Sequence, residues 1–244
     1  ESSPTTPGHW EATLEAFKPS AKIDWILYVA IAMGAIGLFL ALIRTSKWKP
    51  VLASLSIVLA IGFLIKPIDN PTFALWGLPG LCGAGLIAWL LLEPLATRRP
   101  GASLPLSFMV LFTGLAMFTE KTGGISLALT YGALSGVCGA ALVVAWLNPK
   151  LSFAGGATPM LAAIPPTALW LQAWYYYGDA PWYAFPLMLL VIPLLWLGEI
   201  PLVTKRPPWV GVLIRASLVA IPAVIAIVLA MSEQPTDSYL ETYG

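Results

Sequence analysis

Long apolar segments with almost no charged residues constrain this chain more than any other feature. We identify eight of them, at residues 24–43, 50–65, 73–92, 104–119, 125–147, 158–176, 182–200 and 208–231. A bilayer core about 30 Å thick is crossed by a helix of about 20 apolar residues, or by a shorter one where the membrane thins. Because backbone groups in lipid must bond within their own segment, the sequence predicts an all-α, polytopic transmembrane helix bundle of about eight spans.

The balance of charge supports a membrane protein and excludes one class of partner. Only 10% of the residues are charged and 58% are hydrophobic, whereas soluble domains carry about 25% charged residues. The net charge is +1, and no basic stripe is present to neutralise phosphates. We therefore expect no nucleic-acid partner.

The loops between the segments predict an orientation. Eight basic residues lie in the loops after the odd-numbered segments and four on the opposite side. Since positive loops stay in the cytoplasm, both termini are expected to be extracytoplasmic. The sequence begins without Met and with a polar stretch, so we expect removal of a signal peptide, the alternative being that the numbering begins inside a longer precursor.

Three regions follow from this reading. Residues 1–22 form an extracytoplasmic N-terminal segment, in which 9–18 can make a short amphipathic helix. Residues 23–231 form the membrane domain. Residues 232–244 form a polar extracytoplasmic tail.

Two stretches of the chain resemble each other. The sequence "GLCGAGLIAW" at residues 80–89 nearly recurs as "GVCGAALVVAW" at 136–146. Each even-numbered segment also opens with proline, at Pro50, Pro105, Pro159 and Pro208. Proline suits the first turn of a helix because its missing N–H has no partner there. The pattern predicts four tandem helical-hairpin repeats of the same topology.

The small residues of the repeat are interpreted as a packing surface. Helices in lipid associate where small side chains let their backbones approach. The residues assigned to this role are Gly80, Cys82, Gly83, Gly132, Gly136, Cys138 and Gly139. A reactive thiol is the alternative for the cysteines, but it needs a cationic neighbourhood that the sequence does not place beside either one.

Two ionisable residues can meet inside the last hairpin. Arg215 lies seven residues beyond Pro208, about 10 Å along its helix. Glu199 lies near the cytoplasmic end of the seventh segment, so a Glu199–Arg215 pair is geometrically reasonable. The alternative is that Arg215 extends to the interface and the glutamate is solvated.

A solute path, if one exists, is expected in the sixth segment. Pro165 and Pro166 can free carbonyl groups there, and Thr167 and Gln172 are the most polar pair within any segment. The alternative is that these prolines only bend a packed helix.

Several kinds of chemistry are missing from the sequence. The single histidine, His9, is in the N-terminal tail, so a haem held by two histidines and a histidine metal site are excluded. No lysine lies within a segment, which excludes a retinal Schiff base, and no nucleotide or hydrolase motif is present. We predict no catalytic residue, no metal and no cofactor, but expect bound lipid.

These observations favour a non-enzymatic integral membrane protein, a structural or accessory subunit of a larger membrane complex. Its expected partners are membrane lipids and either other proteins or further copies of the chain. The alternative is a transporter or channel for a neutral or weakly polar solute. A cavity reaching Thr167 and Gln172 would favour transport, whereas a filled bundle with an exposed small-residue groove would favour the subunit.

Overall fold

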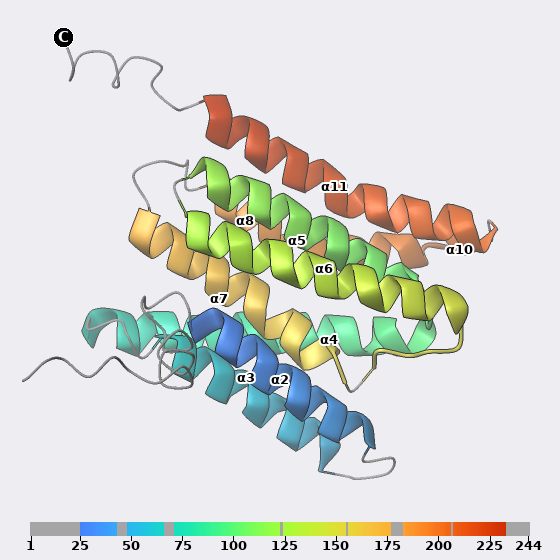
Figure 1. Ribbon diagram of the computed structural model, residues 1–244, viewed down its shortest axis with the longest axis horizontal. Helices are drawn as coiled ribbons and strands as arrows, with labels where there is room; N and C mark the ends of the chain where they lie inside the picture. Colours follow the sequence, from blue (N-terminus) through green and yellow to red (C-terminus); the bar gives the residue numbers. More distant parts are fainter. Residues whose placement is uncertain are drawn as a thin grey trace, which may run out of the picture.

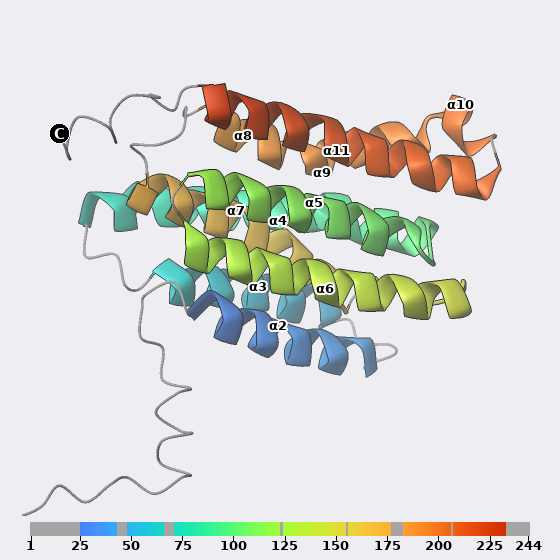
Figure 2. The same cartoon turned by 45° about the horizontal axis from the view of Figure 1, so that its top comes forward.

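A computed structural model describes residues 25–42, 48–65, 71–122, 124–154, 156–176, 183–205 and 207–232. All regular structure in these ranges is helical, which confirms the predicted all-α class. The long helices are α2 (Trp25–Leu42), α3 (Lys49–Ile65), α4 (Pro71–Arg98), α5 (Ser103–Lys121), α6 (Ile125–Leu147), α7 (Thr158–Tyr176) and α11 (Pro208–Ser232). They lie side by side along one axis; α2 to α7 alternate in direction along the chain, and α11 runs the same way as α7 (Figures 1 and 2).

Proline lies at the start of most of the long helices. Pro50, Pro105, Pro159 and Pro208 all lie within the first three residues of their helices, where a missing N–H removes no intrahelical bond. The predicted segments 125–147 and 158–176 coincide with α6 and α7. α7 is one continuous helix through Pro165 and Pro166.

Two elements differ from the predicted segments. α4 continues through Pro94 to Arg98, beyond the predicted end at residue 92. The ring of Pro94 disturbs the ladder, and the indole Nε1 of Trp196 donates to Leu91 O nearby at 3.1 Å. Neighbouring groups of this kind let membrane helices continue through proline.

The seventh segment is broken into short pieces. They are α8 (Ala184–Leu189), α9 (Val191–Leu194), the 3₁₀ helix η2 (Leu195–Glu199) and α10 (Pro201–Thr204). Pro186 and Pro193 each remove a backbone donor. Ile200 is extended, with ψ 140°, as expected for a residue before proline.

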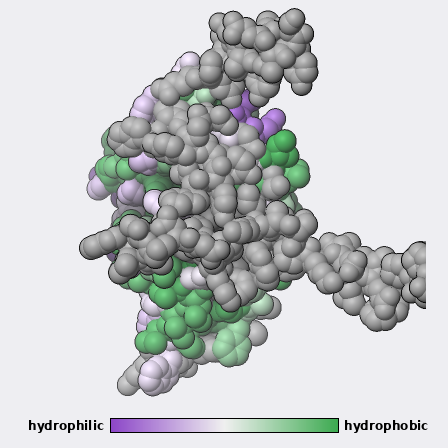
Figure 3. Space-filling model, turned by 90° about the vertical axis from the view of Figure 1, so that its left-hand side faces the viewer, coloured by the Kyte–Doolittle hydropathy of each residue, from purple (hydrophilic) through white to green (hydrophobic). Residues whose placement is uncertain are grey.

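Four of the described helical stretches are long and apolar enough to cross a membrane: Gly77–Arg98, Ser103–Lys121, Leu127–Leu147 and Trp209–Ser232. Their outward side chains are apolar and exposed, among them Leu90, Leu129 and Ile221. Hydrophobic surface is visible in the end-on view of Figure 3. The chain is therefore a membrane protein, while the count of eight spans stays a prediction.

Only two of the four predicted hairpins pack as pairs: α2 lies against α3, and the pieces of the seventh segment lie against α11. α5 packs against α6 and α11, and α7 lies against α2, α3 and α4. Contacts between α4 and α5, and between α6 and α7, are sparse over the described residues. Lipid tails are as apolar as the helices, so sequence neighbours gain nothing special by pairing and surface complementarity decides. The four hairpins are thus not packed alike, and a fourfold hairpin repeat stays a prediction from the sequence.

Aromatic side chains fill the interior around α5. Phe112 stacks on Tyr131 of α6 with ring centroids 6.2 Å apart. Phe118 meets Phe185 of α8 edge to face at 5.3 Å. Rings in such arrangements add to the free energy of burial, and they join the α5–α6 pair to the broken seventh segment.

Close helix contact occurs at glycines other than those predicted. A Cβ added at Gly114 of α5 would lie 2.8 Å from Ala223 Cβ of α11, and one at Gly85 of α4 would lie 2.9 Å from Ile61 of α3. Gly37 of α2 lies against the backbone of Gly156. These three positions tolerate no larger residue without movement of a neighbour.

The prediction that the repeat glycines bring helices of this chain together is wrong at four positions. A Cβ added at Gly80, Gly83, Gly132 or Gly136 would have no heavy atom within 4 Å. A Cβ at Gly139 would make only an ordinary contact, 3.5 Å from Met109 Sδ. Gly85, rather than Gly80 or Gly83, meets another helix, because residues two or five positions apart point to different sides of a helix with 3.6 residues per turn.

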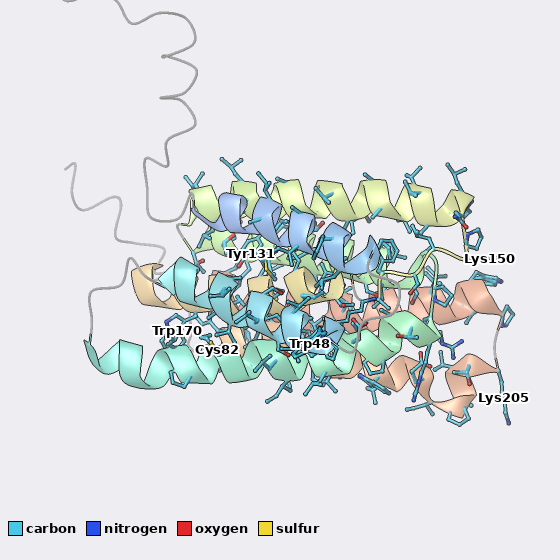
Figure 4. All side chains as sticks on the ribbon, turned by 90° about the horizontal axis from the view of Figure 1, so that it is seen from below. Trp48, Cys82, Tyr131, Lys150, Trp170 and Lys205 are labelled. Atoms are coloured by element: carbon cyan, nitrogen blue, oxygen red, sulfur yellow. The ribbon has the colours of Figure 1, made fainter. Side chains whose placement is uncertain are left out.

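The predicted tails and amphipathic segment lie outside the described residues. The described basic residues Lys150 and Lys205 lie at the same end of the bundle (Figure 4). The prediction that this basic end faces the cytoplasm stays a prediction.

Candidate functional site

Three charged side chains from distant parts of the sequence meet at the basic end of the bundle. Glu199, the last residue of η2, accepts from Arg215 Nη2 of α11 at 2.7 Å. Its two carboxylate oxygens also accept from Arg99 Nε, just after α4, at 3.0 and 3.1 Å. The structure thus brings the predicted pair together and adds a second arginine to the same carboxylate.

Arg215 is held deep between helices. Only 5% of its side chain is exposed. Nη2 also donates to Gly198 O at 2.8 Å, whereas Nη1 reaches Ser103 Oγ only at 3.5 Å. Nε has no hydrogen-bond partner in the described part of the chain. Several donors of this buried cation are therefore incompletely satisfied, which is costly away from water.

Glycine makes room for this arginine. A Cβ added at Gly198 would lie 2.6 Å from Arg215 Cγ and 2.7 Å from its Nε. The side chain therefore runs directly over the backbone of η2, and any larger residue at this position would displace it.

A cavity of about 520 Å³ adjoins the cluster. Its walls come from the α4–α5 connection, the end of α6, α10 and the start of α11, and they include Arg98, Arg99, Ser103, Trp146, Trp209 and Arg215. Gly101, with φ +93°, turns the α4–α5 connection, a conformation that favours glycine. Its N–H donates to Leu151 O at 2.8 Å, which joins this turn to the α6–α7 connection.

The surroundings of the cluster are tied together by further polar contacts. The Arg98 guanidinium lies over the Trp196 ring, 5.5 Å from its centroid. Thr158, the first residue of α7, donates to a carboxylate oxygen of Glu93. Ser152 Oγ donates to Ala96 O at 3.1 Å. The last turns of α4 thus contact both the broken segment and the start of α7.

The sequence identified only part of this site. Glu199 and Arg215 were found because charges are rare within apolar segments. Arg98 and Arg99 are among the eight basic loop residues that predict the orientation, and no pattern in the sequence predicts a role for Ser103. The sequence feature that could have indicated them is the pair of arginines at the end of α4, which is followed four residues later by the serine that begins α5.

A second hollow lies on the outer side of the α5–α6 pair. It has a volume of about 520 Å³ and includes Gly132, Ala128, Ala116 and Glu120 in its walls. Thr113 and Ser135, also in its walls, hydrogen-bond to each other across the two helices at 2.8 Å. Ser135 Oγ also reaches Met109 O at 3.1 Å. We call this hollow the α5–α6 groove.

The remaining predicted residues that the structure describes are not in the walls of either hollow. Pro165, Pro166 and Thr167 are buried in α7, and the Thr167 hydroxyl donates to Ala163 O at 2.8 Å. The Gln172 side chain lies outside the described residues. Cys138 is buried and Cys82 partly buried, both as free thiols against the apolar core.

Comparisons with other proteins add no family or relative: no known family model matches the chain, and no curated protein matches it. The two hollows are therefore the features of the described structure that bear on its function.

Proposed function

We propose that the chain is a non-enzymatic membrane subunit, and that the α5–α6 groove receives a transmembrane helix of another membrane protein. The observation that carries the proposal is the open space over Gly132 in this groove and over Gly136, four residues farther along the same apolar helix.

Glycine within a helix needs a reason. Each one costs up to about 1 kcal/mol of helix stability relative to alanine. Nothing within the described chain packs on Gly132 or Gly136 to offset that cost. Close approach of a second helix is the gain that small residues provide in lipid.

The groove has further features that suit a helix. Ala116 and Ala128 widen it, and the Thr113–Ser135 hydrogen bond lies within it. Hydroxyl groups of this kind can form hydrogen bonds to an incoming helix. Glu120 lies at the end of α5 remote from the arginine cluster.

Transport of a solute has less support. The residues expected to line a path, Pro165, Pro166 and Thr167, are buried in α7, and the threonine hydroxyl bonds to its own helix. Three cavities are described, and none has these residues in its walls.

The test is the mass of the assembly that the chain forms in its native membrane. A tagged chain is extracted in mild detergent and measured by native mass spectrometry. We expect a complex heavier than the 26.1 kDa chain that contains a second protein in fixed ratio. Gly132→Leu with Gly136→Leu should release the chain as a monomer, because leucine side chains fill the space that the partner helix needs.

Gly34→Leu provides the matched control. Gly34 also lies on an apolar helix with no atom within 4 Å of an added Cβ, but it is on α2 rather than in the groove. The control should leave the complex intact. A wild-type chain that is monomeric or associates only with itself would refute the subunit proposal, as would a complex unaffected by the double substitution.

A further inference from the structure

The cavity beside the arginine cluster has a strong excess of positive charge. Arg98, Arg99 and Arg215 all contribute to its walls, and its described lining includes no carboxylate. Glu199 bonds two of these arginines from outside the lining, and over the described residues no other acid forms an ion pair with them. Three guanidinium groups against one carboxylate leave an attraction for anions.

Donors remain available on two of the arginines. Arg99 bonds Glu199 through Nε, and within the described ranges its two outer nitrogens have no hydrogen bond, which leaves them to bind an anion. Arg215 is 4% exposed, and its Nη1 lies near Gly211 of the cavity wall and 3.5 Å from Ser103 Oγ. Buried guanidinium groups recognise oxyanions such as phosphate through paired N–H groups.

The backbone adds to this attraction. α5 begins at Ser103 with no side-chain cap, and α11 begins at Pro208. Residues from the first turn of each helix are in the cavity wall. Helix N-termini carry partial positive charge and unpaired N–H groups. The partial charge of both helix starts adds to that of the arginines, although at α11 the N–H groups of Val210 and Gly211 already bond Pro207 O.

We propose that this cavity binds a phosphate-type oxyanion, supplied either by the headgroup of an anionic lipid or by a soluble phosphate ester. Its place in the molecule suits either source. The exposed indoles of Trp146 and Trp209 border it, and tryptophan is enriched at the level of lipid headgroups. The proposal is independent of the α5–α6 groove and of any partner protein.

The test measures binding of defined phosphates to the intact chain. The chain is placed in phosphatidylcholine nanodiscs that contain phosphatidylglycerol, and lipid retained after release is measured by native mass spectrometry. In parallel, inorganic phosphate and glycerol 3-phosphate are added to the detergent-solubilised chain, and the shift of Tm is recorded. We expect retained phosphatidylglycerol, a phosphate-dependent rise in Tm, or both.

Arg98→Gln with Arg99→Gln should weaken the observed binding by at least about tenfold, because two charge-assisted contacts are lost. Glu199 keeps Arg215 as its partner in this variant. Ser103→Ala, which preserves every charge, should weaken binding by about threefold. Lys150→Gln with Lys205→Gln removes the same charge from the same end (Figure 4) but from outside the cavity, and should change binding less than twofold.

The two arms distinguish the sources. Retention of phosphatidylglycerol alone identifies a lipid headgroup site, and a response to soluble phosphate alone identifies a site for a free ester. The proposal is overturned if the wild-type chain binds neither, or if the lysine control weakens binding as much as the arginine variant does.

Discussion

Replacing Glu199 with alanine should be among the most destabilising single substitutions in the chain. Glu199 neutralises Arg215, whose side chain is 5% exposed and whose Nη2 lies 2.7 Å from the carboxylate. After Glu199→Ala, the guanidinium stays buried with Gly198 O as its one close acceptor. Removing one partner of a buried ion pair costs about 3–5 kcal/mol.

The second arginine provides an internal comparison. Arg99 bonds the same carboxylate at 3.0 Å, but 36% of its side chain is exposed. Water can therefore solvate whichever charge is left, and exposed pairs contribute about 0–1 kcal/mol. Arg99→Ala should thus cost at most about 1 kcal/mol, several-fold less than Glu199→Ala, although both break a contact to one carboxylate.

The assay is unfolding of the detergent-solubilised chain by heat or by a denaturing detergent, followed by circular dichroism. The double variant Glu199→Ala with Arg215→Met should recover most of the lost stability, because it removes the unpaired charge and fills the space with an apolar chain. Equal losses for Glu199→Ala and Arg99→Ala would refute the reasoning. So would a double variant that is less stable than Glu199→Ala alone.

Two further predictions concern packing and use the same unfolding assay. Gly114→Ala should destabilise the chain by about 1–3 kcal/mol, because the new methyl group lies 2.8 Å from Ala223 Cβ. Gly80→Ala, which has open space around the new methyl group, should leave stability unchanged or raise it by up to about 1 kcal/mol. A larger loss of stability for Gly80→Ala than for Gly114→Ala would contradict the packing described. Tyr131→Phe should leave stability unchanged or raise it slightly, because the buried hydroxyl has no hydrogen-bond partner in the described part of the chain, and a loss above about 1 kcal/mol would show that the hydroxyl is bonded.

The positions of the helices could be predicted because they depend on local properties. Apolar length and first-turn proline are read directly along the chain, and α6 and α7 begin and end where expected. The breaks after Leu189 and Leu194 could only be anticipated as kinks, since proline in a membrane helix can bend it or end it. α7 stays continuous through two adjacent prolines, whereas the seventh segment does not.

Pairing of the helices and most of the site depend on distant contacts and could not be predicted in this way. In lipid no polar face marks the side of a helix that points outward, so the pattern did not distinguish Gly85 from Gly80 or Gly83. The Glu199–Arg215 pair could be predicted because charged residues are rare within the apolar segments and these two lie on consecutive segments. Arg99 joins them because the end of α4 lies against the broken segment, where Trp196 bonds Leu91 O, and no spacing in the sequence encodes that contact.

The position of α7 has a consequence for biosynthesis. This helix lies against α2, α3 and α4, yet the ribosome must add all of α5 and α6 before it emerges. The first three helices are therefore synthesised before their common neighbour, and α5 is synthesised before α11. The packing of α2, α3 and α4 is thus completed only when α7 has been made, and that of α5 only when α11 has been made. A chain truncated after Leu147 would lack both of these helices.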